Sequence, residues 1–109
     1  MPTHKEFQKF EIRVGTITEV MDFPEAIIPA YKLKISFGEY GIRTSSAQIT
    51  KSYTKEELLN KQVVAVINFP PKQIANFISE CLVLGVPTAD GHVILLEPDK
   101  EVPVGLSIA

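Results

Sequence analysis

Hydrophobic and polar residues alternate without interruption over residues 31–37, and this is the clearest pattern in the chain. A period of two places the aliphatic and aromatic side chains on one face of a strand and the lysines on the other. A second alternating segment begins at Glu11, and its phase slips at Gly15, which predicts a strand with a bulge at that glycine. Residues 42–48 follow the turn 38–41 and predict a third strand with small polar side chains.

Two short helices are predicted by capping boxes, in which a threonine and a glutamate three residues later satisfy each other's free backbone N–H groups. The pairs are Thr3 with Glu6 and Thr54 with Glu57. The first helix is expected to end near Phe10. The second is expected between Tyr53 and Asn60, after the third strand.

The second half of the chain predicts further strands. Residues 62–69 are β-branched and apolar on both faces, which is typical of a central strand covered on each side, and this run ends at Pro70 and Pro71. Strands are also expected at 80–86 and 92–96, joined by a turn containing Asp-Gly. Alternation continues over 102–108.

This order predicts an all-β fold: an OB-fold, a five-stranded Greek-key barrel with a short N-terminal helix, a helix between strands three and four, and extra C-terminal strands. A plain antiparallel sandwich with a helix at each end is the alternative. A bulge in the long first strand favours the barrel, because closing a small barrel requires strongly bent strands. The 109 residues are interpreted as one domain, 1–109.

The composition is that of an ordinary globular domain with one cysteine, so no internal disulfide is possible. The longest apolar run, Val63–Ile67, is far shorter than the ~20 residues of a membrane-spanning helix. Lys5, Glu6 and Lys9 interrupt what would be the apolar core of a secretion signal. We therefore expect a cytoplasmic protein with no membrane insertion.

Positive charge is confined to the middle of the chain. Residues 31–72 contain seven basic and three acidic side chains (+4), whereas the flanking segments carry −2 and −4 and the whole chain carries −2. Charges are felt only within about 10 Å at ordinary salt, so a local basic face can hold phosphates on an acidic protein. The candidate phosphate contacts are Lys32, Lys34 and Arg43 on neighbouring strands, with Lys51 or Lys72 nearby. A solvated sheet face is the alternative.

The segment 68–77 carries more apolar surface than a loop normally exposes. It predicts a groove for apolar segments of unfolded chains, in which asparagine amides bond an extended backbone. The candidate contacts are Asn68, Phe69, Ile74, Asn76 and Phe77. Alternatively, these side chains close the barrel end or form a dimer seam.

No motif indicates catalysis or a cofactor. His4 and His92 lie far apart in sequence, and Cys81 falls in an apolar run, so no zinc signature is present. The chain has no glycine-rich phosphate loop, and Ser45 and Ser46 lack a base at a known spacing. We expect a protein that is not an enzyme and needs no small-molecule cofactor.

Apolar residues at both ends of the chain exceed what a five-stranded barrel needs, which predicts a homodimer seam. These residues are Phe7, Phe10, Val104, Leu106 and Ile108.

Four blocks carry a family resemblance: residues 10–17, 31–35, 45–50 and 68–80. In these blocks the chain resembles the CsaA group of the tRNA-binding OB domains, a family that includes the C-terminal extension of bacterial methionyl-tRNA synthetases. The resemblance implies a cytoplasmic homodimer linked to protein export, a chaperone that holds unfolded preproteins and binds tRNA. Ser79, near the end of the last block, joins the candidate tRNA contacts. A tRNA-binding module without a chaperone role is the alternative.

Overall fold

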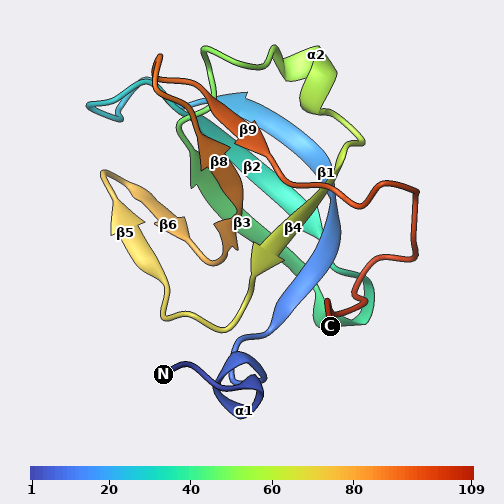
Figure 1. Cartoon of the computed structure of the whole chain (residues 1–109). Coiled ribbons are helices and arrows are strands. Elements are labelled where there is room, and N and C mark those ends of the chain that lie inside the picture. The colour runs from blue at the N-terminus through green and yellow to red at the C-terminus, as the bar shows by residue number, and fades with distance from the viewer.

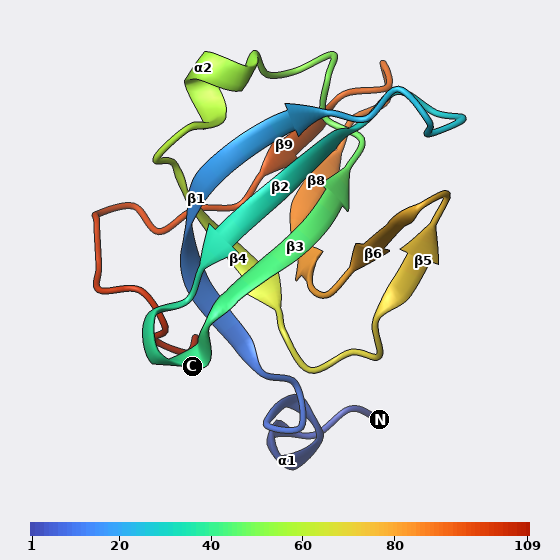
Figure 2. The same cartoon turned by 180° about the vertical axis from the view of Figure 1, so that it is seen from behind.

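Five antiparallel strands form the body of the computed structural model, which describes residues 1–109 (Figure 1). They are β1 (Ile12–Asp22), β2 (Tyr31–Ser36), β3 (Ile42–Ala47), β4 (Gln62–Val66) and β7 (Leu82–Val83), in the order β3-β2-β1-β4-β7. The first half of β1 pairs with β4 and the second half with β2, which curls the sheet into a nearly closed barrel (Figure 2). The predicted all-β OB-fold is confirmed.

The other elements lie around this barrel. They are the helices α1 (His4–Phe7) and α2 (Lys55–Leu58), the 3₁₀ turn η1 (Gly38–Tyr40), and the hairpins β5 (Lys72–Ile74) with β6 (Phe77–Ser79) and β8 (Gly85–Pro87) with β9 (Val93–Leu95). α2 connects β3 to β4, as predicted.

Alternation in β2 fills the barrel interior. Leu33, Ile35 and Phe37 are fully buried, whereas Lys34 between them is exposed. The five residues Val63–Ile67 are all buried, which confirms the predicted central strand.

The predicted bulge at Gly15 is wrong. Gly15 pairs regularly with β4, and the register between β1 and β2 shifts at Thr18 instead. A Cβ atom at position 15 would stand 2.6 Å from side-chain atoms of both Ile35 and Phe37. The glycine is therefore required by the packing of the core on β1 and not by a bulge.

Both capping boxes are confirmed, but the helices are shorter than predicted. Each contains four residues, with Thr3 or Thr54 as the N-cap. α2 ends because Leu59 is extended and Asn60 has a positive φ of 68°. Leu58 is the one residue of α2 that is buried, so this helix caps one end of the core.

Two segments of the chain form different secondary structure from that predicted. The expected strand 80–86 is split: β7 pairs with β4, whereas β8 leaves the barrel to pair with β9. The segment after β4, expected as a loop, contains the β5–β6 hairpin. Its two-residue turn places Ala75 at a φ of 51°.

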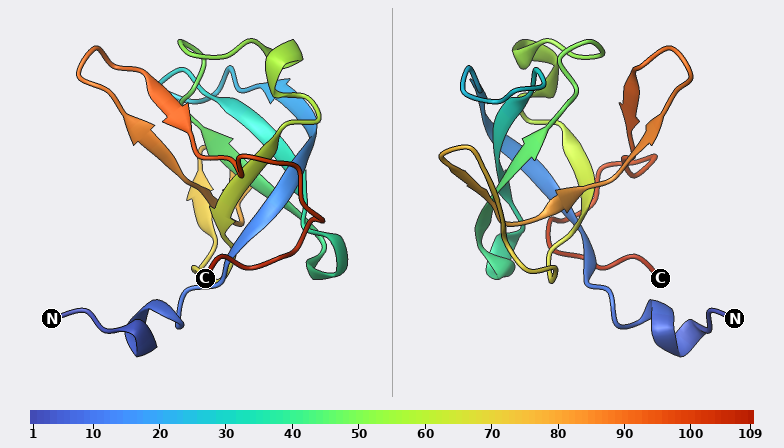
Figure 3. Two further views of the ribbon diagram at one scale, coloured as in Figure 1. Left: turned by 45° about the vertical axis from the view of Figure 1, so that its right-hand side comes forward. Right: turned by 90° about the vertical axis from the view of Figure 1, so that its left-hand side faces the viewer.

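Both chain ends lie at the same end of the molecule, and α1 projects away from the barrel (Figure 3). None of the α1 residues is buried. The C-terminal tail runs antiparallel to β1, where the Gly105 N–H donates to the Val14 carbonyl (2.8 Å) and the Ile108 N–H to the Ile12 carbonyl (3.0 Å).

Candidate functional site

A groove of about 400 Å³ opens in the side of the barrel, between the β5–β6 hairpin and the residues of β7 and β9. Ile49, Cys81 and Leu95 line it and also belong to the buried core. Phe69 and Lys72 contribute to its outer part, and both are exposed. The groove therefore gives direct access from the surface to the apolar interior.

The groove exists because β3 and β7, the two outer strands of the sheet, are not joined by a ladder. A local cluster holds them together: the N–H groups of Glu80 and Cys81 donate to the Thr44 carbonyl at 2.8 and 3.2 Å. In return, the Glu80 carboxylate accepts from the Thr44 N–H (3.0 Å) and hydroxyl (2.8 Å). Neither charged residue of the lining forms an ion pair; the Glu80 carboxylate is engaged by these hydrogen bonds, whereas the Lys72 ammonium has no polar partner within the chain.

Cys81 forms part of the apolar wall. Burial raises the pKa of its thiol to about 12, so the group is neutral at physiological pH. A neutral buried thiol behaves as a small apolar side chain and is a poor nucleophile.

Two of the predicted polypeptide contacts, Phe69 and Ile74, line the groove. Phe77 does not line it, because it lies at the hairpin tip and packs edge-on against Phe23, with ring centroids 5.5 Å apart. The placement of Phe77 in the groove is therefore corrected. Phe77 shares one face of the hairpin with Ile74 and Ser79, but its position beside the turn leaves it outside the groove lining.

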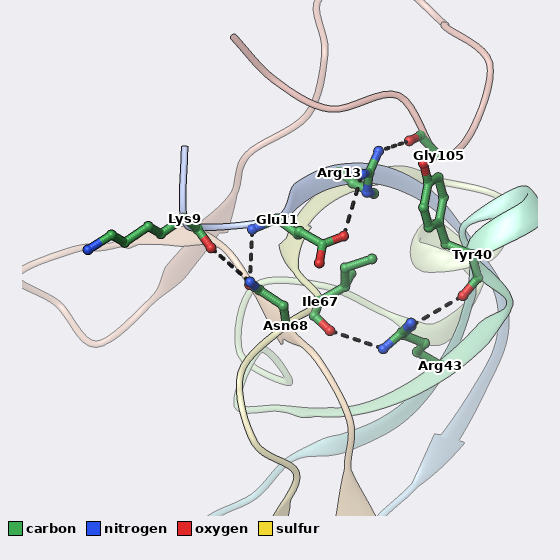
Figure 4. A network of polar contacts seen from close by, with 8 residues as sticks. All are labelled: Lys9, Glu11, Arg13, Tyr40, Arg43, Ile67, Asn68 and Gly105. Carbon is green, nitrogen blue, oxygen red and sulfur yellow. Dashed lines mark hydrogen bonds and ion pairs between the residues drawn. The ribbon is translucent and has the colours of Figure 1, made fainter. Parts of the chain in front are cut away.

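The two predicted asparagine amides are already engaged within the fold. Figure 4 shows that the Asn68 side chain donates to the Lys9 carbonyl (2.8 Å) and accepts from the Glu11 N–H (2.9 Å), which ties the segment between α1 and β1 to the residues that follow β4. The Asn76 amide donates to the Glu25 carboxylate at 3.2 Å. Each amide therefore has a structural role through partners distant in sequence, which the prediction did not include, and its second N–H remains for a further bond.

Lys32 and Lys34 lie on the outer face of β2, as predicted, whereas Arg43 does not share that face. Residues directly opposite in an antiparallel pair point to the same side, and Arg43 lies opposite the buried Ile35. Its guanidinium donates to the carbonyls of Ile67 (3.0 Å) and Tyr40 (3.3 Å) (Figure 4). Arg43 is therefore a structural group at one end of the barrel.

The outer face carries a lysine flanked by two aromatic rings. The Lys32 ammonium lies 5.0 Å from the ring centre of Phe23 and 5.6 Å from that of Phe77. Phe77 retains partial exposure, whereas Phe23 is buried. Lys34 pairs with Glu19 at 3.3 Å, an exposed contact of small energetic value. The outer face of β2 thus combines two lysines with one partly exposed aromatic ring, Phe77, and Glu19 offsets part of the positive charge.

The remaining candidate tRNA contacts lie elsewhere. Lys72 and Ser79 face each other across the hairpin and line the groove. Lys51 lies in the loop before α2, beside Gly91. The six candidates therefore do not form one continuous face.

The five candidate dimer residues also separate into two kinds. Phe7, Phe10, Leu106 and Ile108 are exposed, whereas Val104 is half-buried. Phe10 stacks edge-on against Phe69, with centroids 5.8 Å apart.

The C-terminal tail, which carries Val104, Leu106 and Ile108, is held in place by Arg13. Its guanidinium lies 3.8 Å from the Tyr40 ring centre and donates to the Gly105 carbonyl at 2.9 Å (Figure 4).

Neither helix is long and apolar enough to cross a membrane. No three His, Cys, Asp or Glu side chains gather where they could hold a metal ion.

Residues 12–107 match the family model described as "Putative tRNA binding domain". The chain belongs to this family. Its structure is also similar to two solved CsaA chaperones, and this confirms the resemblance found in the sequence. The protein from Picrophilus torridus is 63% identical with a TM-score of 0.92, and both chains are covered completely. The protein from Bacillus anthracis is 51% identical with a TM-score of 0.93, over 100% of this chain and 99% of the other.

Curated relatives include methionine–tRNA ligases. The enzyme from Pyrococcus furiosus is 40% identical over 104 residues, which are 95% of this chain but 14% of the ligase. The chain thus spans about one seventh of the length of these relatives, and it corresponds to one domain of a larger enzyme.

Proposed function

We propose that this protein is a cytoplasmic chaperone that binds segments of unfolded or export-bound preproteins in the groove. The observation that carries the proposal is the groove itself, whose wall includes core residues such as Ile49 and Leu95. An apolar side chain that enters it exchanges water for the barrel interior, and full burial of one such side chain contributes roughly 1.5–3 kcal/mol.

The comparisons support a binding role over a catalytic one. Similarity to the CsaA chaperones extends over the whole chain, whereas similarity to the ligases covers 14% of their length. We therefore propose that the protein is not an enzyme and that ligase chemistry belongs to other parts of those proteins.

Contact with tRNA is the second candidate function. It is favoured by the family match and by the basic face around Lys32 and Lys34, where Phe77 offers a partly exposed ring. The two ligands are expected on different surfaces: polypeptide in the groove and phosphates on the outer face of β2.

Salt dependence tests which ligand is bound. Phosphate binding weakens by orders of magnitude between 50 and 200 mM salt, whereas capture of apolar side chains responds little. The purified protein should suppress aggregation of an unfolded client equally at both concentrations. Failure to suppress aggregation, together with tight and strongly salt-dependent tRNA binding, would favour the tRNA module without a chaperone role.

A homodimer is the proposed assembly. α1 buries none of its residues on its own barrel, and exposed Phe7, Phe10, Leu106 and Ile108 lie near the two chain ends. Light scattering should give twice the monomer mass of 12.1 kDa, and removal of residues 1–9 should weaken association. A particle of monomer mass at micromolar concentration would contradict this assembly.

A further inference from the structure

β5 has an open edge beside the groove. In Figure 1, β6 lies between β5 and β3, so β5 is the outermost strand on this side. Ile74 and Phe77 close the two-residue turn and therefore exchange the first pair of ladder bonds. The next pair, Gln73 and Ile78, is then not hydrogen-bonded, and the backbone N–H and C=O of Gln73 point away from β6.

Two observations agree with this assignment. The Ile78 carbonyl, which points to the other side of the hairpin, accepts the Thr44 hydroxyl at 2.8 Å. No backbone hydrogen bond outside the ladders uses Gln73. One donor and one acceptor thus stand unpaired on an exposed strand, which is the usual template for adding another strand.

The open edge is short. Pro71, two residues before Gln73, has no N–H to offer at this edge. The carbonyl of Ala75, two residues after Gln73, already accepts a hydrogen bond from the Gln73 side-chain amide at 3.2 Å. The edge therefore offers its unpaired backbone groups at Gln73.

We propose that an extended polypeptide segment adds to β5 as a further strand, so that backbone pairing at Gln73 holds it while alternate side chains enter the groove. This inference rests on the proposed chaperone function and specifies how the client is recognised. Lys72 and Ile74, the neighbours of Gln73, both line the groove. Side chains of an added strand that lie opposite these two residues face the same way.

The surroundings favour polypeptide over nucleic acid at this edge. Phe69 and Ile74 beside it are apolar, and Lys72 is the only cation that lines the groove. Client segments should therefore alternate apolar and polar residues, and an acidic residue is favoured opposite Lys72.

Backbone methylation of a peptide tests the pairing. The probe is a fluorescein-labelled nine-residue peptide in which leucines alternate with serines, and in each variant one amide nitrogen is methylated. In antiparallel pairing, the arrangement of all ladders in this structure, the serine amides point to β5 and the leucine side chains face the groove. Methylation of a central serine amide should raise Kd about tenfold, and methylation of its leucine neighbours should have little effect.

Two substitutions test the same bond from the protein. Gln73→Pro removes the outward N–H without breaking a hairpin bond, whereas Gln73→Ala keeps the N–H and loses only the side chain. Gln73→Pro should weaken the peptide as methylation does, and Gln73→Ala should not. If Gln73→Pro fails to fold by circular dichroism, the methylation series decides alone.

The outcomes separate the inference from the function on which it rests. Equal tolerance of methylation at every amide, with binding still weakened by Ile74→Ser, overturns strand addition and leaves the groove. A Gln73→Pro variant that loses self-association but binds the peptide normally assigns the edge to a second copy of the chain. No binding of the peptide by the wild-type protein contradicts the chaperone function itself.

Discussion

Replacing Ile74 with serine should weaken polypeptide binding while leaving the fold intact. Ile74 is half-buried and lines the groove, so a bound client covers the remainder of its side chain. Full burial of an aliphatic side chain is worth roughly 1.5–3 kcal/mol, and the covered half together with the client group that it touches gives about 1–2 kcal/mol. This range corresponds to a 5- to 30-fold increase in Kd, by about 1.4 kcal/mol per factor of ten.

The hairpin supplies a matched control. Ile78 is the same residue type in the same hairpin, is 47% exposed, and lies opposite Gln73, on the face away from the groove. Fluorescence anisotropy with a labelled unfolded polypeptide at 200 mM salt should show weaker binding for Ile74→Ser and unchanged binding for Ile78→Ser. Equal losses in the two variants would refute the placement of the client in the groove.

Three further predictions concern the basic face, the core and the second helix cap. Lys32→Glu with Lys34→Glu should flatten the salt dependence of tRNA binding by about 1.8 units of slope, near 0.9 per lost phosphate contact, and an unchanged slope in a filter-binding titration would place the phosphates elsewhere. Gly15→Ala should cost about 1–3 kcal/mol, because its Cβ would stand 2.6 Å from core atoms; urea unfolding with an unchanged midpoint would contradict this packing. Hydrogen bonds from the backbone and side chain of Thr54 lower the pKa of the Glu57 carboxyl below its ordinary value of 4.5. The ionised carboxylate therefore contributes fully to the free energy of unfolding above pH 4.5, and this contribution is lost as the pH falls through the lowered pKa. Glu57→Gln should therefore lose less stability than the wild type between pH 6 and pH 3. If the free energy of unfolding falls equally with pH in both proteins, the cap does not contribute in this way.

Local signals in the sequence were sufficient where the structure depends on neighbouring residues. The capping box at Thr54 requires only two side chains three positions apart, and the alternation over 31–37 places Leu33 and Ile35 inside without knowledge of any other strand. These features follow from backbone geometry alone, and both were confirmed.

Errors arose where a side chain depends on a distant partner. The face of Arg43 is set by its register with Ile35 across two strands, which alternation within one strand does not reveal. The engagement of Asn68 depends on Lys9 and Glu11, more than 55 positions away along the chain. The sequence signal at these positions, a polar residue in a strand or loop, is the same for a structural role and for a binding role.

Gly15 shows the same limitation in a different form. A glycine in an alternating strand predicts either a bulge or close packing, and only the positions of Ile35 and Phe37 decide between them. The bulge lies at Thr18, a residue type that carries no signal for one.

The central claim, that unfolded polypeptide lies in the groove of the barrel wall, is tested most directly by nuclear magnetic resonance. Backbone amide signals of the isotope-labelled protein are followed during titration with an unfolded client peptide at 200 mM salt. We expect the largest shifts at groove residues, among them Ile74, Val83 and Val93, and an unchanged signal for Lys34 on the outer face of β2. Shifts centred on Lys34 and its neighbours, with an unperturbed groove, would contradict this claim.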